Sequence, residues 1–298
     1  MGAEQLILGS RGSDLALAQT RLVEAALRKA WPELEIAIEI IRTSGDEGVK
    51  PQLVADRKAG RKGMFTREIE KALLERRIDL AVHSAKDLPS EVQSDLEIAV
   101  VLPRANTEDV LITKNGAGLT TLPHGATIAT GSIRRQRQLA WQRPDFQIVS
   151  LRGNVPTRLR KLRENADWDG IVLARAGLER LGLGITGEVL SQEHFVPAGG
   201  QGVIAIEARR DDDRARRVVA AINDRVTHLC LRAEREFLRL LNGDCDSPVG
   251  VQAKIERAGI QLRAQVFEEN ESAPRVGCVT GENPETIAAE LMEQLYGG

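Results

Sequence analysis

One cysteine of this sequence lies where a thiol can tether a bound group or act as a nucleophile. Cys245 belongs to the run Gly243-Asp244-Cys245-Asp246, a tight turn of glycine and aspartate that directly follows a long helical pattern. The thiolate is the reactive form of cysteine, and an exposed turn leaves it accessible. The other cysteines, Cys230 in a helical pattern and Cys278 in a strand pattern, are interpreted as small buried hydrophobic residues.

A carboxylate at a second position is a candidate for acid–base chemistry. Asp87 ends the run His83-Ser84-Ala85-Lys86-Asp87, which directly follows the apolar pattern of residues 78–82. A carboxylate held near a reacting group can stabilise a cation and relay protons. An aspartate before Leu88-Pro89 is more often part of a turn or a cap, so the position alone does not decide between catalysis and a structural role.

Arginines gather at two turns that follow strand patterns and open helical patterns. The first turn is Gly131-Ser132-Ile133-Arg134-Arg135, and the second is Leu151-Arg152-Gly153-Asn154, with Arg158 a few residues further on. A helix N-terminus presents backbone N–H groups and a partial positive charge, so both turns predict anion sites. A planar guanidinium suits a carboxylate, but the same spacing also suits phosphate. Three further arginines are expected to be solvated, namely Arg137, Arg160 and Arg163.

Alternating strand-like and helical patterns must position these residues. Up to about residue 101, apolar runs typical of strands alternate with amphipathic helical patterns, a rhythm that predicts a doubly wound α/β sheet. In such sheets the functional loops lie at the carboxyl ends of the strands. Ser13 is the expected N-cap of the first helix, and Asn154 is the expected cap of a helix that runs through Arg163. The expected strands are residues 6–9, 34–41 and 78–82, and the expected helices are residues 13–30 and 66–76.

The same rhythm recurs after Pro103, and the pattern changes again near residue 221. Residues 203–207 are a further buried strand that can return the chain to the first sheet. The final part has one long helix, three alternating strands and a terminal helix, which predicts a small antiparallel sheet covered by helices. The predicted domains are residues 1–101 with 197–220, residues 102–196, and residues 221–298.

The arrangement of two such lobes predicts a cleft between them. Residues 43–62 form a loop rich in Gly, Lys, Arg and Asp. Long loops of this kind often carry function, so this one is the candidate mobile lid, although a plain solvated connection explains the composition equally well.

The composition limits which classes of function fit. The 298 residues carry 41 Lys+Arg against 43 Asp+Glu, a formal net charge of −2, so no basic field favours nucleic acid. No stretch approaches the ~18 apolar residues of a membrane span, and a cytoplasmic protein without a membrane partner is expected. Three cysteines without CxxC spacing and four histidines favour neither a disulfide framework nor a structural metal. No GxxxxGK[ST] loop is present, so nucleotide binding is the weaker case.

Taken together, the motifs resemble the porphobilinogen deaminase (hydroxymethylbilane synthase) family. The matching segments, in the family's order over nearly the whole chain, are Arg11-Gly12-Ser13, His83 to Asp87, the two arginine turns, Pro197-Ala198-Gly199-Gly200-Gln201-Gly202 and Cys245. The resemblance implies a transferase of porphyrin, tetrapyrrole and heme biosynthesis that joins four porphobilinogen molecules head to tail on a dipyrromethane primer. Ammonia is lost at each addition, and hydrolysis releases linear hydroxymethylbilane. The resemblance further implies a cytoplasmic monomer without metal, with two doubly wound lobes like those of periplasmic binding proteins.

The resemblance also implies roles for individual residues. Cys245 holds the dipyrromethane through a thioether, and Asp87 is catalytic, accepting hydrogen bonds from pyrrole N–H groups and stabilising an azafulvene-like cation. Each pyrrole carries an acetate and a propionate, which favours carboxylate over phosphate as the partner of the arginines. The implied cofactor-binding residues are Lys86, Asp87, Ser132, Arg134, Arg135, Arg152, Arg158 and Cys245. The implied substrate-binding residues are Arg11, Ser13, Gln19, Lys62, Phe65, Arg152, Arg158, Arg180 and Gln201.

Two positions depart from the family's usual sequence. Asp244 stands where glycine is usual, and because a neighbouring carboxylate disfavours the thiolate, slower loading of the primer is expected. Gly131 stands where serine is frequent, which removes one hydrogen-bond donor but keeps the turn feasible.

Two other classes of function use some of the same residues. A non-catalytic module that binds small anions would also have two lobes and clustered arginines, but it leaves Cys245 and Asp87 unexplained. A cysteine-dependent transferase with another acidic substrate would use Cys245 afresh in every turnover. A stable dipyrromethane adduct on Cys245 distinguishes the family's chemistry from both.

Overall fold

The chain divides into two compact units in the computed structural model, which describes residues 5–42, 66–184, 186–243, 247–269 and 271–297. The first unit comprises Met1–Arg104 and Val203–Leu231, and the second comprises Ala105–Gly202 and Arg232–Gly298. The division into three domains, with residues 221–298 as a separate one, stays a prediction. Among the described residues, no helix combines the length and the apolar character that a membrane crossing requires.

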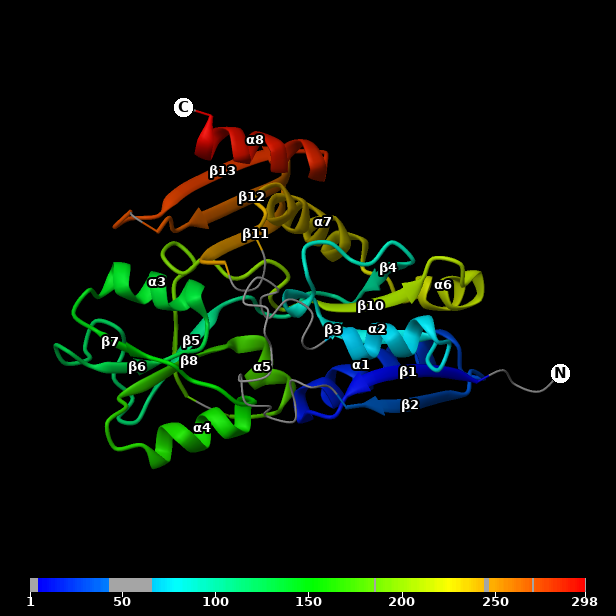
Figure 1. Cartoon of the computed structure of the whole chain (residues 1–298), viewed down its shortest axis with the longest axis horizontal. Helices are drawn as coiled ribbons and strands as arrows, with labels where there is room; N and C mark the ends of the chain where they lie inside the picture. Colours follow the sequence, from blue (N-terminus) through cyan, green and yellow to red (C-terminus); the bar gives the residue numbers. More distant parts are fainter. Residues whose placement is uncertain (1–4, 43–65, 185, 244–246, 270, 298) are drawn as a thin grey trace, which may run out of the picture. The chain divides into compact units, whose positions relative to one another are not determined.

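The first unit is built on a mixed sheet whose described strands have the order β2-β1-β3-β10-β4 (Figure 1). Strands β1, β2 and β3 are parallel, whereas β10 runs antiparallel to both β3 and β4. The predicted return of the chain to this sheet is therefore made by β10. The strands are β1 (Leu6–Arg11), β2 (Ile36–Ile41), β3 (Leu80–Ser84), β4 (Leu96–Val101) and β10 (Ile204–Arg209).

Helices cover both faces of this sheet. On one face, α1 (Asp14–Ala30) and α6 (Asp213–Ala220) pack against Leu8 and Val82. On the other face, α2 (Arg67–Leu74) packs against Ala81. The apolar side chains of α1 recur at helical spacing and form one buried side, which is why this segment is a helix rather than a strand. The helical residues that enter these cores are Val23, Leu27, Ala215 and Val219 on one face, and Ile69, Ala72 and Leu73 on the other.

The second unit contains a sheet with the same pattern, in the order β7-β6-β8-β5-β9. Strands β6, β7 and β8 are parallel, and β5 runs antiparallel to β8 and β9. Helices α4 and α5 share one apolar core, and α3 contributes to another. The elements are β5 (Asp109–Thr113), β6 (Thr127–Ala129), α3 (Ile133–Gln142), β7 (Gln147–Val149), α4 (Val155–Glu164), β8 (Gly170–Ala174), α5 (Arg175–Arg180) and β9 (Glu188–Val189).

The last part of the chain forms a small antiparallel sheet. Helix α7 (Arg225–Leu240) leads to β11 (Val249–Glu256), β12 (Gly259–Val266) and β13 (Arg275–Gly281), which pair in sequence order. The terminal helix α8 (Pro284–Tyr296) begins after the N-cap Asn283 and buries Ile287, Ala288 and Leu291. The predicted fold class is confirmed, with two doubly wound α/β sheets and a three-stranded antiparallel sheet.

The interpretation of the two described cysteines is half right. Cys230 is buried within α7, as expected. Cys278 is exposed, so its interpretation as a buried residue is wrong. Cys278 lies on β13, an edge strand of the described sheet. The preceding residue, Gly277, faces Leu291 of α8. Because successive side chains of a strand point to opposite faces, Cys278 lies on the face away from α8.

Candidate functional site

Asp87 lies at the exposed end of a short 3-10 helix, η2 (Ala85–Asp87), that directly follows β3. The strand is buried as far as His83, and η2 then brings Lys86 and Asp87 out beyond the carboxyl end of the strand. This is the position at which α/β sheets present functional groups. A ligand therefore has access to the Asp87 carboxylate.

The backbone in front of Asp87 is held by contacts within the first unit. Gln19 of α1 is buried, and its Nε2 donates to Ser84 Oγ at 2.8 Å. The Ala85 amide donates to the Val203 carbonyl at 3.0 Å. Gln19, an implied substrate ligand, thus fixes the end of β3 in this structure.

The other two implied ligands of this unit that the structure describes lie at the start of α1. Arg11 is the last residue of β1 and is half-buried. Ser13 Oγ accepts a hydrogen bond from the Ala16 amide at 3.3 Å, which confirms Ser13 as the N-cap. The predicted opening of the first helix is therefore correct.

Beneath the Asp87 loop lies a buried pair of ionisable side chains. His83 Nε2 is 3.3 Å from Glu207 Oε2, and both side chains are almost fully buried. Glu207 lies on β10, two residues from Ala205, which pairs directly with His83. The sequence patterns place both residues in buried strands but do not reveal that they meet.

In the second unit, Arg134 and Arg135 open α3 but do not lie at its surface. Ser132 caps this helix, since its Oγ accepts from the Arg135 amide at 3.5 Å. Arg134 is only 3% exposed and Arg135 only 5%. The predicted turn is correct, and the two guanidinium groups are buried behind it.

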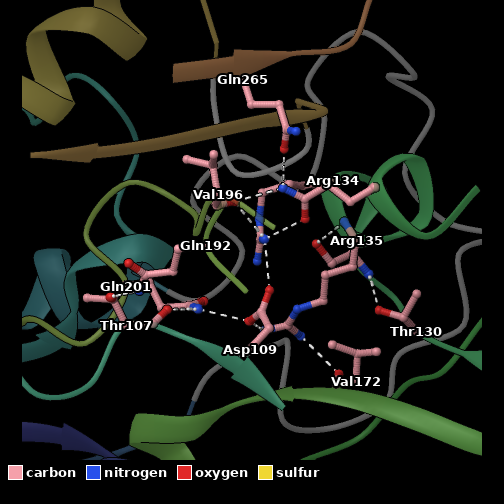
Figure 2. Close-up of polar contacts among 12 residues, drawn as sticks. Thr107, Asp109, Thr130, Arg134, Arg135, Val172, Gln192, Val196, Gln201 and Gln265 are labelled. Carbon is pink, nitrogen blue, oxygen red and sulfur yellow. Dashed lines mark hydrogen bonds and ion pairs between the residues drawn. The ribbon is translucent and has the colours of Figure 1, made fainter. Parts of the chain in front are cut away.

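Asp109, the first residue of β5, is the common acceptor of this cluster (Figure 2). Arg134 Nη1 donates to Asp109 Oδ2 at 2.8 Å, and Arg135 Nη2 donates to Asp109 Oδ1 at 2.7 Å. Gln201 Nε2 also donates to Oδ1, at 2.8 Å, and to the Thr107 carbonyl at 2.7 Å. The Asp109 side chain is fully buried, so one carboxylate gathers donors from α3 and from the loop that precedes β10.

The charges of this cluster do not cancel. Burial by itself raises the pKa of the Asp109 carboxyl, but the charges of Arg134 and Arg135 outweigh it and hold that pKa well below its usual range. Burial lowers the pKa of Arg134 and Asp109 opposes that change, yet an arginine remains protonated in proteins. Two guanidinium groups thus face one carboxylate, and one net positive charge remains.

Each guanidinium also keeps a buried donor without a partner. Among the described residues, nothing accepts a hydrogen bond from Arg134 Nε or Arg135 Nε, and both nitrogen atoms are buried. The remaining contacts are made with neutral groups, from Arg134 Nη1 to Gln138 Oε1 at 2.8 Å and from Arg135 Nη1 to the Val172 carbonyl at 3.1 Å. Unsatisfied buried donors with a surplus positive charge are the features expected of a site for an anion.

A second line of contacts joins Arg134 to the C-terminal sheet. Gln138 Nε2 donates to Gln265 Oε1 of β12 at 2.6 Å and to the Val196 carbonyl at 2.8 Å. Arg134 Nη1 donates to the same carbonyl at 3.0 Å (Figure 2). The position of Arg134 is therefore determined by β5, by the segment that precedes β10 and by β12 within the second unit.

The second arginine turn is more open. Asn154 caps α4 by accepting from the Thr157 amide at 3.0 Å, and Pro156 lies in the first turn, both as predicted. Arg152 is exposed, and Arg158 is half-buried with its Nε donating to the Gly153 carbonyl at 2.7 Å. These two side chains are accessible to a ligand.

Gly131 marks the place where the two arginine turns meet. A Cβ atom at this position would lie 2.5 Å from the Leu151 carbonyl oxygen. Real Cβ atoms do not approach a backbone atom so closely, so the close packing of these turns favours glycine at position 131 in this structure.

The last two implied ligands are Gln201, which lies on the loop that precedes β10, and Arg180 of α5, which contacts that loop. Gln201 is 1% exposed, and its Nε2 donates a hydrogen bond to Asp109 Oδ1. Arg180 donates from Nη2 to the Gly202 carbonyl at 2.7 Å, and burial lowers its pKa. Gly202 has φ +84° and lies against the Ala105 carbonyl, so only glycine fits there without strain.

Several predicted residues lie outside the described part of the chain. They are Lys62, Phe65 and Cys245, together with Asp244 and the candidate lid of residues 43–62. The clusters that the structure does describe are the Asp87 loop in the first unit and the arginine turns in the second.

The sequence patterns missed the acceptor that organises the arginines. Asp109 opens the apolar run Val110-Leu111-Ile112, and an aspartate at the start of a buried strand was the available signal. Gln138 and Gln265 gave no comparable signal, because an amide in a helix or strand pattern usually faces solvent.

Comparison with known proteins identifies relatives over most of the chain. Residues 6–217 match the family model described as "Porphobilinogen deaminase, dipyromethane cofactor binding domain". Residues 228–297 match "Porphobilinogen deaminase, C-terminal domain".

Individual relatives are similar over most of their length. The chain is 46% identical over 267 residues to "Porphobilinogen deaminase" of Roseiflexus sp. (strain RS-1), covering 88% of this chain and 86% of the relative. It is 40% identical over 299 residues to the protein of that name from Chlorobium phaeobacteroides (strain BS1), covering 98% and 94%. For the protein of that name from Moorella thermoacetica the identity is 42% over 294 residues, covering 98% and 93%.

Proposed function

The chain belongs to the porphobilinogen deaminase family, and we propose that it joins porphobilinogen molecules on a dipyrromethane held by Cys245. It is a transferase whose small-molecule substrate is porphobilinogen, and it has a dipyrromethane cofactor-binding domain. The observation that carries the proposal is the family match over residues 6–217 and 228–297, because these ranges include all the predicted site residues. The monomeric state and the cytoplasmic location stay predictions.

The proposed reaction is the head-to-tail condensation of four substrate molecules. In each condensation the bond from the aminomethyl carbon to nitrogen breaks and ammonia leaves. The carbon then bonds to the free α-carbon of another pyrrole, which gives up its proton. One water molecule releases the finished chain as hydroxymethylbilane. When bound, the dipyrromethane supplies the pyrrole carbon from which the chain is extended.

The residues of the second unit fit an anionic oligopyrrole. The cluster around Asp109 retains one positive charge and two buried Nε–H donors, and the exposed Arg152 adds a further guanidinium nearby in the sequence. Acetate and propionate groups would give these donors charged acceptors, and such hydrogen bonds are the strong ones. Arg134, Arg135, Arg152 and Arg158 would hold the carboxylates of the cofactor, and Ser132 is a further proposed cofactor-binding residue.

Asp87 is the proposed catalytic residue. Its position at the exposed carboxyl end of β3, with the backbone fixed by Gln19 and Val203, supports this role. The Asp87 carboxylate accepts hydrogen bonds from pyrrole N–H groups and lowers the energy of the cation that forms when ammonia leaves. Lys86, the preceding residue in the sequence, would supply a positive charge for a carboxylate of the cofactor. The proposed substrate-binding residues are Arg11, Ser13, Gln19, Lys62, Phe65, Arg152, Arg158, Arg180 and Gln201.

Cys245 is the proposed attachment point of the dipyrromethane. Cys230 is buried within α7, which leaves it no access to a ligand. Cys278 is exposed on an edge strand but stands in none of the family motifs. A thioether at Cys245 keeps the growing chain bound between additions, so this residue anchors the product rather than attacking a new substrate in each turnover.

Matched arginine variants of α3 test the proposal. Porphobilinogen consumption, ammonia release and cofactor content are measured for Arg134→Gln, Arg135→Gln and the control Arg137→Gln, whose side chain is half-exposed on the same helix. Arg134→Gln and Arg135→Gln are expected to lose about tenfold or more in cofactor loading or turnover, because a buried carboxylate of the oligopyrrole loses a charged partner. The control is expected to keep both.

Two outcomes would contradict the proposal. If Arg134→Gln and Arg135→Gln match Arg137→Gln in loading and turnover, the arginines do not hold the oligopyrrole. If the protein binds porphobilinogen without releasing ammonia, it is a small-anion binding module instead.

A further inference from the structure

Asp109 takes no part in the proposed chemistry, yet it stands at the centre of the arginine cluster. Arg134 and Arg135 are consecutive residues of α3, and consecutive side chains on a helix point about 100° apart. Both nevertheless reach the same carboxylate, at 2.8 Å and 2.7 Å (Figure 2). Two guanidinium groups brought so close in a buried place repel one another unless an anion lies between them. Asp109 supplies that anion.

We infer that Asp109 is a positioning residue, which makes the guanidinium groups of Arg134 and Arg135 converge in the geometry that receives the cofactor's carboxylates. The inference rests on the proposed function, since it assumes that these arginines bind the oligopyrrole. Asp109 itself is fully buried and its two oxygens are occupied by Arg134, Arg135 and Gln201. It therefore acts through the arginines and not on the substrate.

The two oxygens of Asp109 accept hydrogen bonds from different donors. Among the described residues, Oδ1 accepts from Arg135 and Gln201, whereas Oδ2 accepts from Arg134. An asparagine at position 109 has only one acceptor oxygen. This oxygen is expected to take the Oδ1 position, because there it accepts from two donors, Arg135 and Gln201, instead of one. Its amide NH₂ then faces Arg134 Nη1, where donor meets donor. Asp109→Asn is therefore expected to displace Arg134 more than Arg135.

The charge balance supports the same assignment. Because the two arginines hold the pKa of Asp109 well below its usual range, the carboxylate is ionised near neutral pH. The cluster then keeps one positive charge, against which an acetate or propionate can bind. A neutral residue at 109 would leave two unshielded cations, which favours separation of the guanidinium groups over their convergence.

The test compares cofactor loading in four variants of the full chain. Intact mass of the folded fraction, after incubation with porphobilinogen, is measured for Asp109→Asn, Arg134→Gln, Arg135→Gln and the double variant Asp109→Asn/Arg134→Gln. We expect Asp109→Asn to lower the loading rate about tenfold or more although both arginines are present. The double variant is expected to resemble Arg134→Gln within about threefold, because residues that act as a unit are not additive. The double variant also has one buried cation fewer than Asp109→Asn. Its loading rate can therefore still be compared with that of Arg134→Gln if Asp109→Asn folds poorly.

The control is an ion pair in the first unit between a buried arginine and a half-buried aspartate. Arg209 is buried and contacts Asp212, which also caps α6 through the Ala215 amide at 2.9 Å. Asp212→Asn breaks the ion pair and keeps the cap, so it lowers the melting temperature without touching the arginine turns. Its loading rate is expected to equal that of the unmodified protein.

The outcomes separate the inference from the proposed function. If Asp109→Asn loads like the unmodified protein, or if its effect multiplies with that of Arg134→Gln, Asp109 does not act through Arg134 and the inference is overturned. If Arg134→Gln and Arg135→Gln themselves load normally, the proposed function of the arginines fails, whatever Asp109→Asn shows.

Discussion

At the scale of single residues, the buried arginines show how a charged group is made tolerable inside a fold. Burial of a guanidinium is costly unless it is paired and hydrogen-bonded. Arg134 meets that cost with Asp109, Gln138 and the Val196 carbonyl. Asp109 is 25 residues away in sequence, so no local pattern could have shown that Arg134 is buried. The sequence did predict the turn, because a helix cap and its neighbours are local features.

Asp87 is expected to matter for catalysis and little for folding. Substitution of an exposed side chain usually changes stability by no more than about 0.5 kcal/mol, and Asp87 is exposed. Asp87→Asn should therefore melt like the unmodified protein but lose about a hundredfold or more in turnover, because a carboxylate that relays protons contributes at least that much. The turnover number and the melting temperature measure the two effects.

The exposed Asp95 of the same unit provides the control. Asp95→Asn should keep normal turnover. Equal turnover in Asp87→Asn and Asp95→Asn would remove Asp87 from the mechanism.

At the scale of elements, the sequence patterns predicted what depends on neighbours along the chain. The expected helix of residues 13–30 corresponds to α1 and the expected strand of residues 34–41 to β2, and the caps Ser13 and Asn154 also agree with the expectation. The antiparallel direction of β5 within the second sheet and the junction of the two arginine turns were not predicted. Both depend on contacts between distant segments, which periodicity does not encode.

The junction of the two arginine turns makes Gly131 a sensitive position. Gly131→Ser adds a Cβ atom 2.5 Å from the Leu151 carbonyl oxygen, so one turn must move. Such overpacking costs about 1–3 kcal/mol, and we expect a lower melting temperature together with slower cofactor loading.

Gly184 offers a control for the effect of adding a side chain. A Cβ atom there meets no atom within 4 Å. Gly184→Ser should leave the melting temperature and the loading rate unchanged. If Gly131→Ser is equally harmless, the turns are not packed as described.

At the scale of the whole molecule, affinity for an anionic chain must come from local charge. The formal net charge is −2, so no overall field attracts an acidic ligand. The arginine cluster instead provides a buried positive charge within one unit. Because buried pairs are screened little by salt, binding at this cluster is expected to depend only weakly on ionic strength.

The Asp109 cluster also predicts how stability depends on pH. The pKa of Asp109 in the folded protein lies below its unfolded value of about 3.9, so the folded state binds fewer protons in acid. The stabilisation it provides is therefore fully present above about pH 4 and is lost as the pH falls below that value. Asp109→Asn, which leaves two buried cations without their carboxylate, should cost about 3–5 kcal/mol at pH 6.

Urea unfolding followed by tryptophan fluorescence measures the difference in free energy of unfolding between the unmodified protein and Asp109→Asn. Trp141 and Trp168 both lie in the second unit and report on it. The gap between the unmodified protein and Asp109→Asn should narrow between about pH 4 and pH 2. A gap that stays constant over that range would show that the Asp109 carboxylate is not stabilised by its arginines.

The central claim is that one sulfur holds an oligopyrrole on which the product is built. Its most direct test is the intact mass of the purified protein before and after a short exposure to porphobilinogen, compared with Cys245→Ser. We predict that the unmodified protein carries the mass of two pyrrole units and gains further units one at a time, whereas Cys245→Ser carries none. An active protein without added mass, or an adduct that persists in Cys245→Ser, would contradict the claim.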